Sequence, residues 1–165
     1  MPAGYSGTPL PDKLGIKRGV RVVVLGAPWR YGSVVTPLPP EVRISARLGL
    51  TARFVHLFAR RESQLRRALP RAAVALSDDG MLWVSWPKKT SGVATDLTEN
   101  RVRELGLANG LVDVKVCAVD EMWSGLKFVR RLRDRRGSFR LPLGRGGRGA
   151  PGGTGAGLRP LFGPN

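Results

Sequence analysis

The hydrophobic residues of this chain follow two different patterns. Residues 21–26 (RVVVLG) and 53–59 (RFVHLFA) are continuous apolar runs rich in β-branched side chains, which predict strands buried on both faces of a sheet. In residues 62–76 the apolar side chains recur every three or four positions with arginines between them. This spacing predicts an amphipathic helix that is kinked or restarted at Pro70. Residues 81–86 (MLWVSW) predict a further buried strand, so strands and helix alternate.

Shorter signals fill the gaps between these elements. Residues 41–47 alternate apolar and polar side chains, which predicts a strand nearer an edge of the sheet. Residues 78–80 (DDG) predict a turn before the strand that follows them. Asp96 followed by Glu99 matches an acidic variant of the capping box, so we expect Asp96 to open a helix that Gly110 ends.

The last two apolar stretches predict how the sheet closes. Residues 112–118 and 126–129 read as strands with no helix between them, so we expect an antiparallel hairpin. The earlier strands are separated by helices, which predicts right-handed crossovers and parallel pairing. The predicted fold class is therefore α/β, with a mainly parallel sheet of about six strands that ends in an antiparallel hairpin.

A parallel sheet that ends in a hairpin resembles the Rossmann-like fold of class I methyltransferases. Two segments support the resemblance, KLGIKRGVRVVVLGAP through the first strand and LSDDGMLWVSWP from a helix end into a strand. Residues 13–131 can be laid on that plan, with one helix and one strand missing between residues 47 and 52. The resemblance implies a reduced, methyltransferase-like fold.

The cofactor positions of that family are altered in this sequence. The loop after the first strand is normally glycine-rich, but here it reads VVVLGAPWR with one glycine. An acidic residue usually ends the second strand and holds the ribose hydroxyls, whereas residues 41–47 end in arginine. We therefore expect no useful binding of S-adenosylmethionine and assign no cofactor.

A longer resemblance covers about residues 3–131. The segments GYSGTPLPDKLGIKRGVRVVVLGAP, FVHLF, WVSWPKKTSGVATDLTE and GLVDVKVCAVDEMWSGLKFV resemble a family of small bacterial proteins known as domain of unknown function 3052. The resemblance implies a small Rossmann-like bacterial protein in the cytoplasm. It implies no activity.

Composition divides the chain into two parts. Residues 1–132 are expected to form one Rossmann-like domain, and residues 133–165, rich in Arg, Gly and Pro, a disordered tail. Nine arginines and one aspartate in residues 130–165 supply half of the net charge of +16. Short Arg-Gly steps resemble nucleic-acid-binding segments, so the tail favours non-specific attraction to nucleic acid.

Cell compartment and assembly are less constrained by the sequence. No run of about 18 apolar residues is present, so we expect no membrane span, and the amino terminus lacks a secretory signal. With a single cysteine, the chain is most simply a cytoplasmic protein. The sequence predicts no oligomeric state.

The candidate ligand site lies in loops at the carboxyl ends of the strands. Such loops converge at one edge of a parallel sheet, and those after the first two buried strands carry Gly26, Trp29 and Arg60. Lysine and hydroxyl side chains after residue 86 could form an anion cradle, and tryptophans could stack on a planar ring, which suits an anionic small molecule or nucleotide. The predicted ligand-binding residues are Lys88, Lys89, Thr90, Ser91, Gly92, Asp120, Glu121, Trp123 and Ser124.

Several of the candidate residues, and two other polar residues of the chain, have a purely structural interpretation. Lys88 and Lys89 could be a solvated loop, and Asp120 could serve only to terminate the hairpin. His56 lies mid-strand and is expected to be a hydrogen-bonded core residue, and Cys117 to be a buried structural thiol. With one histidine and one cysteine, the chain has no conventional zinc site, and no catalytic residue or metal ligand is assigned.

Three functions remain open on the sequence alone. A non-enzymatic binding or regulatory protein with an anionic-ligand site at the carboxyl edge of the sheet is favoured. A diverged methyltransferase-type enzyme is the second. The third is a polyanion-binding protein that uses the charge of the domain and of the basic tail to hold RNA or DNA.

Overall fold

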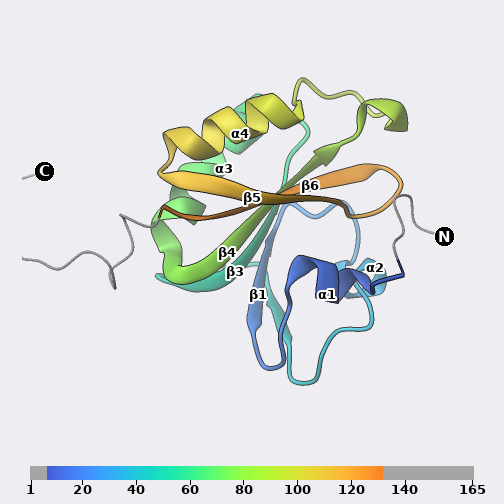
Figure 1. Ribbon diagram of the computed structural model, residues 1–165, viewed down its shortest axis with the longest axis vertical. Coiled ribbons are helices and arrows are strands. Elements are labelled where there is room, and N and C mark those ends of the chain that lie inside the picture. The colour runs from blue at the N-terminus through green and yellow to red at the C-terminus, as the bar shows by residue number, and fades with distance from the viewer. Residues whose placement is uncertain (1–6, 132–165) are drawn as a thin grey trace, which may run out of the picture. The chain divides into compact units, whose positions relative to one another are not determined.

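The apolar runs of the sequence form one six-stranded sheet, shown in the computed structural model of Figure 1. The structure describes residues 7–131. The strand order is β2-β1-β3-β4-β6-β5, with β6 antiparallel to both of its neighbours and the other pairs parallel. The predicted fold class is therefore confirmed. The strands are β1 (Arg21–Leu25), β2 (Arg43–Ser45), β3 (Ala52–Phe58), β4 (Leu76–Pro87), β5 (Leu111–Ala118) and β6 (Trp123–Arg130).

Helices cover both faces of this sheet (Figure 1). The longer pair, α3 (Glu62–Ala75) and α4 (Glu99–Ala108), covers one face, and the shorter pair, α1 (Leu10–Leu14) and α2 (Tyr31–Val34), covers the other. A single 3-10 turn, η1 (Lys89–Ser91), follows β4. The helix α3 continues through Pro70, so no second helix starts there. We refer below to the α3/α4 face and the α1/α2 face.

The two faces bury different side chains. On the α3/α4 face, leucines and alanines of the helices pack on aliphatic strand residues such as Val55 and Leu82. On the α1/α2 face the core is largely aromatic and includes Phe54, Phe58 and Trp83. The alternation of a strand places Trp83 and Trp86 on opposite faces, as their spacing of three predicts.

The strand β4 is longer than the sequence predicts. Residues 78–80 were expected to form a turn, but β4 begins at Leu76 and the ladder with β3 absorbs the extra residues in a register shift between Ala52 and Phe54. The guanidinium of Arg130 donates hydrogen bonds to the carbonyls of Leu76 and Ala73, at 2.8 Å each. A partner from β6 thus satisfies the carbonyls at the end of α3, so the chain can pass directly from helix to strand.

The prediction that Asp96 caps the second long helix is wrong. α4 begins at Glu99, and its N-cap is Thr98, whose side-chain oxygen accepts a hydrogen bond from the backbone N–H of Arg101 at 3.1 Å. Asp96 instead accepts from the backbone N–H of Glu62, 2.8 Å away, at the start of α3. An aspartate can cap a helix to which it is close in space but not in sequence, and sequence spacing does not reveal this.

The fold is reduced between β2 and β3, as the sequence predicts. The chain runs from Ser45 to Ala52 with no helix or strand in between, so β2 lies at one edge of the sheet. Within residues 7–131 no helix has the length and apolarity needed to cross a bilayer. The Arg/Gly/Pro-rich tail predicted for residues 133–165 lies outside the described residues.

Candidate functional site

The topology places a crevice between β1 and β3. From β1 the chain crosses to β2 on one side, and from β3 it crosses to β4 on the other side. The strand order therefore reverses between β1 and β3, and in open α/β sheets ligands bind outside the carboxyl ends of the strands at such a point. A pocket of about 420 Å³ lies there, between the ends of these two strands and the first turns of α3. We call it the switch-point pocket.

A glycine allows the two strand ends to approach each other closely. Gly26, at the end of β1, has φ 74, and a Cβ atom there would lie 2.8 Å from the carbonyl oxygen of Phe58. Both its left-handed backbone and the short distance exclude a side chain. Gly26 thus shapes the floor of the switch-point pocket.

Two arginines line the pocket. Arg60 follows β3 and Arg67 lies one turn into α3, and both side chains are exposed. Within residues 7–131, neither guanidinium has a hydrogen-bond or ion-pair partner, unlike Arg66 beside them, which pairs with Glu62 at 2.7 Å. A pocket with two unneutralised guanidinium groups favours an anion, because these groups bind carboxylate and phosphate oxygens in a forked geometry.

Hydrogen bonds hold the rim of the pocket in place. The side-chain oxygen of Gln64 accepts from the backbone N–H groups of Arg60 and Arg61, at 2.9 and 3.1 Å. The hydroxyl of Thr95 donates to the carbonyl of Arg60 at 2.5 Å. Together with the bond from Asp96 to α3, these contacts fix the backbone that carries Arg60. The segment between η1 and α4 therefore buttresses the pocket rim.

Aromatic side chains form the wall of the pocket on the side of β6. Trp123 lines the pocket and meets Phe58 edge to face, with ring centroids 5.4 Å apart. Trp29 meets Phe58 from another side at 5.2 Å. Trp123 is only 5% exposed, so its ring supports the wall and offers little free surface for stacking. Trp123 therefore lines the wall of the pocket, and little of its ring is available for the predicted stacking on a ligand.

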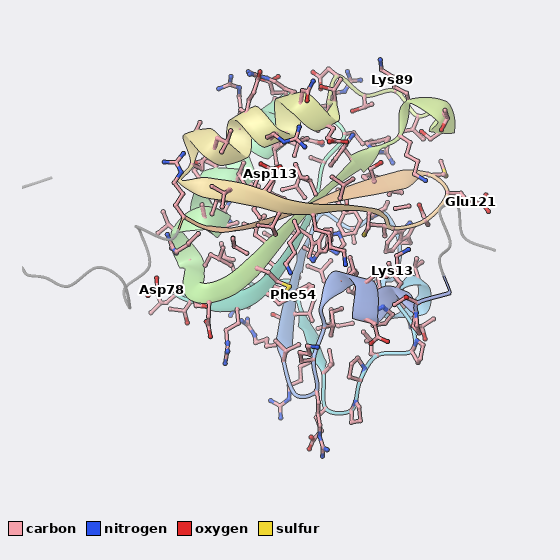
Figure 2. The ribbon with its side chains drawn as sticks, in the orientation of Figure 1. Lys13, Phe54, Asp78, Lys89, Asp113 and Glu121 are labelled. Carbon is pink, nitrogen blue, oxygen red and sulfur yellow. The ribbon has the colours of Figure 1, made fainter. Side chains whose placement is uncertain are left out.

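The predicted ligand-binding loops lie side by side. The backbone N–H of Lys88 donates to the carbonyl of Met122 at 2.8 Å, and Pro87 pairs with Trp123 across the β4–β6 ladder. In Figure 2, Lys89 and Glu121 project from the same end of the sheet. The two predicted loops are thus brought together at the carboxyl end of β4, one strand away from the switch-point pocket.

Several side chains of the predicted site are engaged within their own loops. The Ser91 hydroxyl donates to the Lys88 carbonyl at 2.7 Å and accepts from the N–H of Val93. One carboxylate oxygen of Asp120 accepts from the N–H groups of Met122 and Trp123, at 2.8 and 2.7 Å. Asp120 therefore terminates the hairpin. Ser124 lies within β6 opposite Trp86 and Ala118, while Lys89, Thr90, Gly92 and Glu121 are exposed.

The residues that the sequence analysis missed lie on α3. The pattern of residues 62–76 predicts that the arginines between the apolar positions point away from the core, and it predicts no role for Arg67 or Gln64 in a site. One signal is present in the sequence, since a glutamine in the first turn of a helix is typical of a capping contact. Which outer position faces a pocket depends on the rotation of the helix, which sequence does not supply.

The buried histidine forms a hydrogen-bonded chain through the α1/α2 face. The hydroxyl of Tyr31 lies 2.7 Å from Nδ1 of His56, and Nε2 of His56 lies 2.8 Å from the hydroxyl of Ser85. Burial lowers the pKa of His56 from 6.5 to about 3, so the ring is neutral at neutral pH. The expectation of a hydrogen-bonded core histidine is confirmed.

The described residues hold no group of three or more His, Cys, Asp and Glu side chains that could bind a metal ion. Cys117 is half-buried, more accessible than the buried thiol predicted, because β5 is an edge strand. Burial raises the pKa of its thiol, and the charges of Lys13 and Lys115 oppose that shift. A thiol with a raised pKa is a weak nucleophile at neutral pH.

The position that would hold a ribose does not suit S-adenosylmethionine. The strand β2 ends at Ser45, whose hydroxyl accepts from Arg21 at 3.1 Å and from the N–H of Arg47, also at 3.1 Å. Among the described residues, no carboxylate stands at this strand end. A cationic sulfonium placed in the switch-point pocket would be repelled by Arg60 and Arg67. These residues therefore do not fit the cofactor in the manner usual for the fold.

Several solved structures with a similar fold are those of proteins described as methyltransferases. A protein of Sulfolobus solfataricus described as a type 11 methyltransferase aligns with a TM-score of 0.52 at 14% identity, over 76% of this chain and 91% of that one. The 1,6-didemethyltoxoflavin N1-methyltransferase of Burkholderia thailandensis aligns with a TM-score of 0.49 at 19% identity, over 73% and 74% of the two chains. A TehB-like S-adenosylmethionine-dependent methyltransferase of Corynebacterium glutamicum aligns with a TM-score of 0.47 at 14% identity, over 78% and 91%.

At these identities the similarity shows the fold alone. No family model matches the chain, and no curated protein matches it. The resemblance to domain of unknown function 3052 therefore stays a prediction. What the Sulfolobus structure supports is a methyltransferase-like, Rossmann-like α/β fold.

Proposed function

We propose that this protein binds an anionic small molecule, of about the size of a mononucleotide, in the switch-point pocket. The observation that carries the proposal is the pair of guanidinium groups, Arg60 and Arg67, that line the pocket without an acidic partner among residues 7–131. Acidic side chains pair with the neighbouring Arg66 and Arg101, so those two arginines, unlike Arg60 and Arg67, already have a partner.

The size and rigidity of the pocket support this proposal. Its volume of about 420 Å³ lies in the range of about 300–1,000 Å³ that small-molecule sites occupy. The contacts of Gln64 and Thr95 hold the backbone at Arg60 before any ligand arrives, which lowers the entropy lost on binding. The predicted loops at Lys88 and Lys89 remain a candidate second part of the same carboxyl-edge site.

Isothermal titration with adenosine 5′-monophosphate tests the proposal on the full chain. Three double variants each remove two positive charges: Arg60→Ala with Arg67→Ala in the pocket, Lys88→Ala with Lys89→Ala in the neighbouring loop, and Arg43→Ala with Arg71→Ala as the matched control. We expect the pocket variant to bind about tenfold more weakly or worse, since each lost charge-assisted hydrogen bond contributes about 1.5–3 kcal/mol. The control variant should bind like the wild type.

The outcomes separate the two parts of the carboxyl edge. A loss confined to the Lys88/Lys89 variant would move the site to the predicted loops. Equal binding by all three variants, or no binding by the wild type, would overturn the switch-point proposal. Thermal melting of each variant checks that the fold is kept, and exposed arginines without partners contribute little to it.

The shared fold supports a second candidate, a methyltransferase-type enzyme. The likeness to methyltransferases favours an enzyme of this type over a non-enzymatic domain, although Ser45 and Arg47 stand where the ribose contact is expected. Titration with S-adenosylmethionine tests it. A dissociation constant of about 10 μM or tighter, equivalent to about −7 kcal/mol, would support this candidate. Binding that strengthens in the Arg60→Ala, Arg67→Ala variant would place the cofactor in the same pocket.

A further inference from the structure

Four lysines gather on the α1/α2 face, on the other side of the sheet from α3. We call Lys13, Lys17, Lys115 and Lys127 the lysine cluster. Lys115 in β5 and Lys127 in β6 stand directly opposite each other in the antiparallel ladder, so their side chains leave the sheet on the same face. The Lys115 ammonium donates to the carbonyl of Lys13 at 3.1 Å, which places α1 against this pair. Figure 2 shows Lys13 on α1, below the β5–β6 edge.

The positive charges of the lysine cluster act on one another. Burial first, and then the charges of Lys115 and Lys17, lower the pKa of Lys127. The positive charges of Lys13 and Lys115 both act to lower the pKa of the Cys117 thiol, against the larger effect of burial. Lys17 and Lys115 thus act on Lys127, and Lys13 and Lys115 act on the same thiol. The four amines come from three separate segments of the chain.

No acidic side chain neutralises the cluster within the part of the chain that the structure describes. None of the eight ion pairs there includes a lysine of the cluster. The acid nearest to Lys115 in sequence, Asp113, pairs with Arg103 of α4 at 2.8 Å. The only polar partner described for a cluster ammonium is the carbonyl of Lys13, and a carbonyl dipole does not cancel four charges.

Such an arrangement costs stability unless an anion occupies it. Like charges directly opposite each other on neighbouring strands destabilise a sheet. Lysine ammonium groups are compact point charges that suit phosphate oxygens approaching from any direction. Amines near enough to act on one another favour a compact anion that carries several charges, whereas a polymer backbone would need charges spread along a track.

We propose that the lysine cluster is a second anion site and that its ligand is a compact, multiply charged phosphate anion such as a free polyphosphate. This site lies on the α1/α2 face and uses none of the residues of the switch-point pocket. It therefore stands independently of the function proposed for that pocket.

Titration of the full chain with tripolyphosphate tests this site. The variant Lys115→Ala with Lys127→Ala should bind tripolyphosphate at least about tenfold more weakly than the wild type, because two charge-assisted contacts are lost. Arg43→Ala with Arg71→Ala removes the same charge elsewhere and should leave the affinity within about twofold. Arg60→Ala with Arg67→Ala should also keep this binding. Each variant retains the basic tail, so the background of the tail is the same in all.

A second measurement follows Lys127 in the wild-type protein and needs no variant. Carbon NMR of the lysine side chains should show the lowered pKa of Lys127 rising when tripolyphosphate is added, since an adjacent anion favours the charged amine. An unchanged Lys127 pKa at saturating tripolyphosphate, or equal affinity of the Lys115→Ala, Lys127→Ala variant and the control, would overturn the proposal.

Titration with a single-stranded oligonucleotide provides the comparison with tripolyphosphate. If the cluster served nucleic acid, the cluster variant would lose oligonucleotide affinity and keep its affinity for tripolyphosphate, and the proposal would be overturned. We expect the reverse pattern, with oligonucleotide binding nearly unchanged because the segment 130–165, which supplies half of the net charge, is intact in the variant.

Discussion

The two faces of the sheet differ in how their charged and polar side chains are paired. On the α3/α4 face several charges are paired: Glu62 binds Arg66 and Arg101, and Arg103 binds Glu99 and Asp113. Arg60 and Arg67 of the switch-point pocket stay outside this network. On the α1/α2 face the sheet carries a buried polar chain at its centre and the unpaired lysine cluster toward β5. The ion pairs add to the apolar packing of α3 and α4 on the sheet, whereas the unpaired charges of the pocket and of the lysine cluster can still bind a partner.

The largest effect is expected in the core of the α3/α4 face. Phe128 of β6 is fully buried against Gly106 of α4, where a Cβ atom would overlap its ring. Phe128→Ala should lower the free energy of unfolding by about 3–5 kcal/mol, because it leaves a cavity. Gly106→Ala should cost about 1–3 kcal/mol by overpacking. Urea denaturation measures both.

The double variant sharpens that test. The alanine methyl at position 106 would partly fill the space that Phe128→Ala empties, so the double variant should be less destabilised than the sum of the two single changes. Additive losses would contradict the close packing of α4 on β6.

The loss of stability in acid should have a separate contribution from each face, because His56 on the α1/α2 face and Glu62 on the α3/α4 face titrate in different pH ranges. The pKa of His56 is lowered to about 3 by burial, so between pH 6.5 and 3 the unfolded chain binds more protons than the folded one. Stability is therefore present above pH 6.5 and is lost as the pH falls through this window. Hydrogen bonds from Arg101 and Arg66 lower the pKa of Glu62 from 4.5 to about 2, so its contribution is lost only below pH 4.5.

The free energy of unfolding should thus fall by about 2–3 kcal/mol between pH 7 and pH 4.5, at a limiting slope of about 1.4 kcal/mol per pH unit. His56 is the one histidine of the chain, so His56→Gln should flatten the curve in this window. Glu62→Gln should change the curve only below pH 4.5. A wild-type curve that is flat down to pH 4.5 would mean that the histidine is not held neutral.

The sequence predicts the sheet well because its signals are local. The runs at residues 21–26 and 53–59 appear as β1 and β3, and the absence of a helix between the last two strands predicts their antiparallel pairing. The errors arise where distant segments meet. Residues 78–80 have turn composition but extend β4, because β3 and Arg130 supply partners that sequence neighbours do not.

The candidate site shows the same division. The topology rule correctly predicts that loops at the carboxyl ends of β4 and β5 come together, and it includes Gly26 and Arg60 among the converging residues. It does not reveal that the carboxylate of Asp120 is hydrogen-bonded within the hairpin turn, or that Arg67 lines the switch-point pocket. Both depend on the direction of a side chain. The lysine cluster needs the register of β5 and β6, which a bulge between Asp113 and Lys115 shifts.

A smaller effect is expected where α1 is attached to the sheet. The indole N–H of Trp83 donates to the carbonyl of Leu14 at 2.8 Å in the buried core. Trp83→Phe removes the donor and leaves that carbonyl unsatisfied, which should cost about 1–3 kcal/mol. Hydrogen exchange should show faster exchange of α1 amides than of α4 amides in this variant. Equal protection of both helices would indicate that α1 is held by packing alone.

The smallest expected effect has the opposite sign and concerns Lys127. Lys127→Gln removes one of two like charges that face each other across β5 and β6, so it should raise the free energy of unfolding by a few tenths of a kcal/mol in the absence of phosphate. Because the folded pKa of Lys127 is lowered, its charge costs stability at neutral pH, and this cost is relieved as the pH rises toward 10.5. The gain should shrink at high pH and in 1 M salt, which screens the repulsion. Lys89→Gln in the exposed loop after β4 is the matched control and should leave the melting temperature unchanged. A loss of stability in Lys127→Gln would show that the ammonium has a favourable partner, and the view of the lysine cluster as unpaired charge would have to be abandoned.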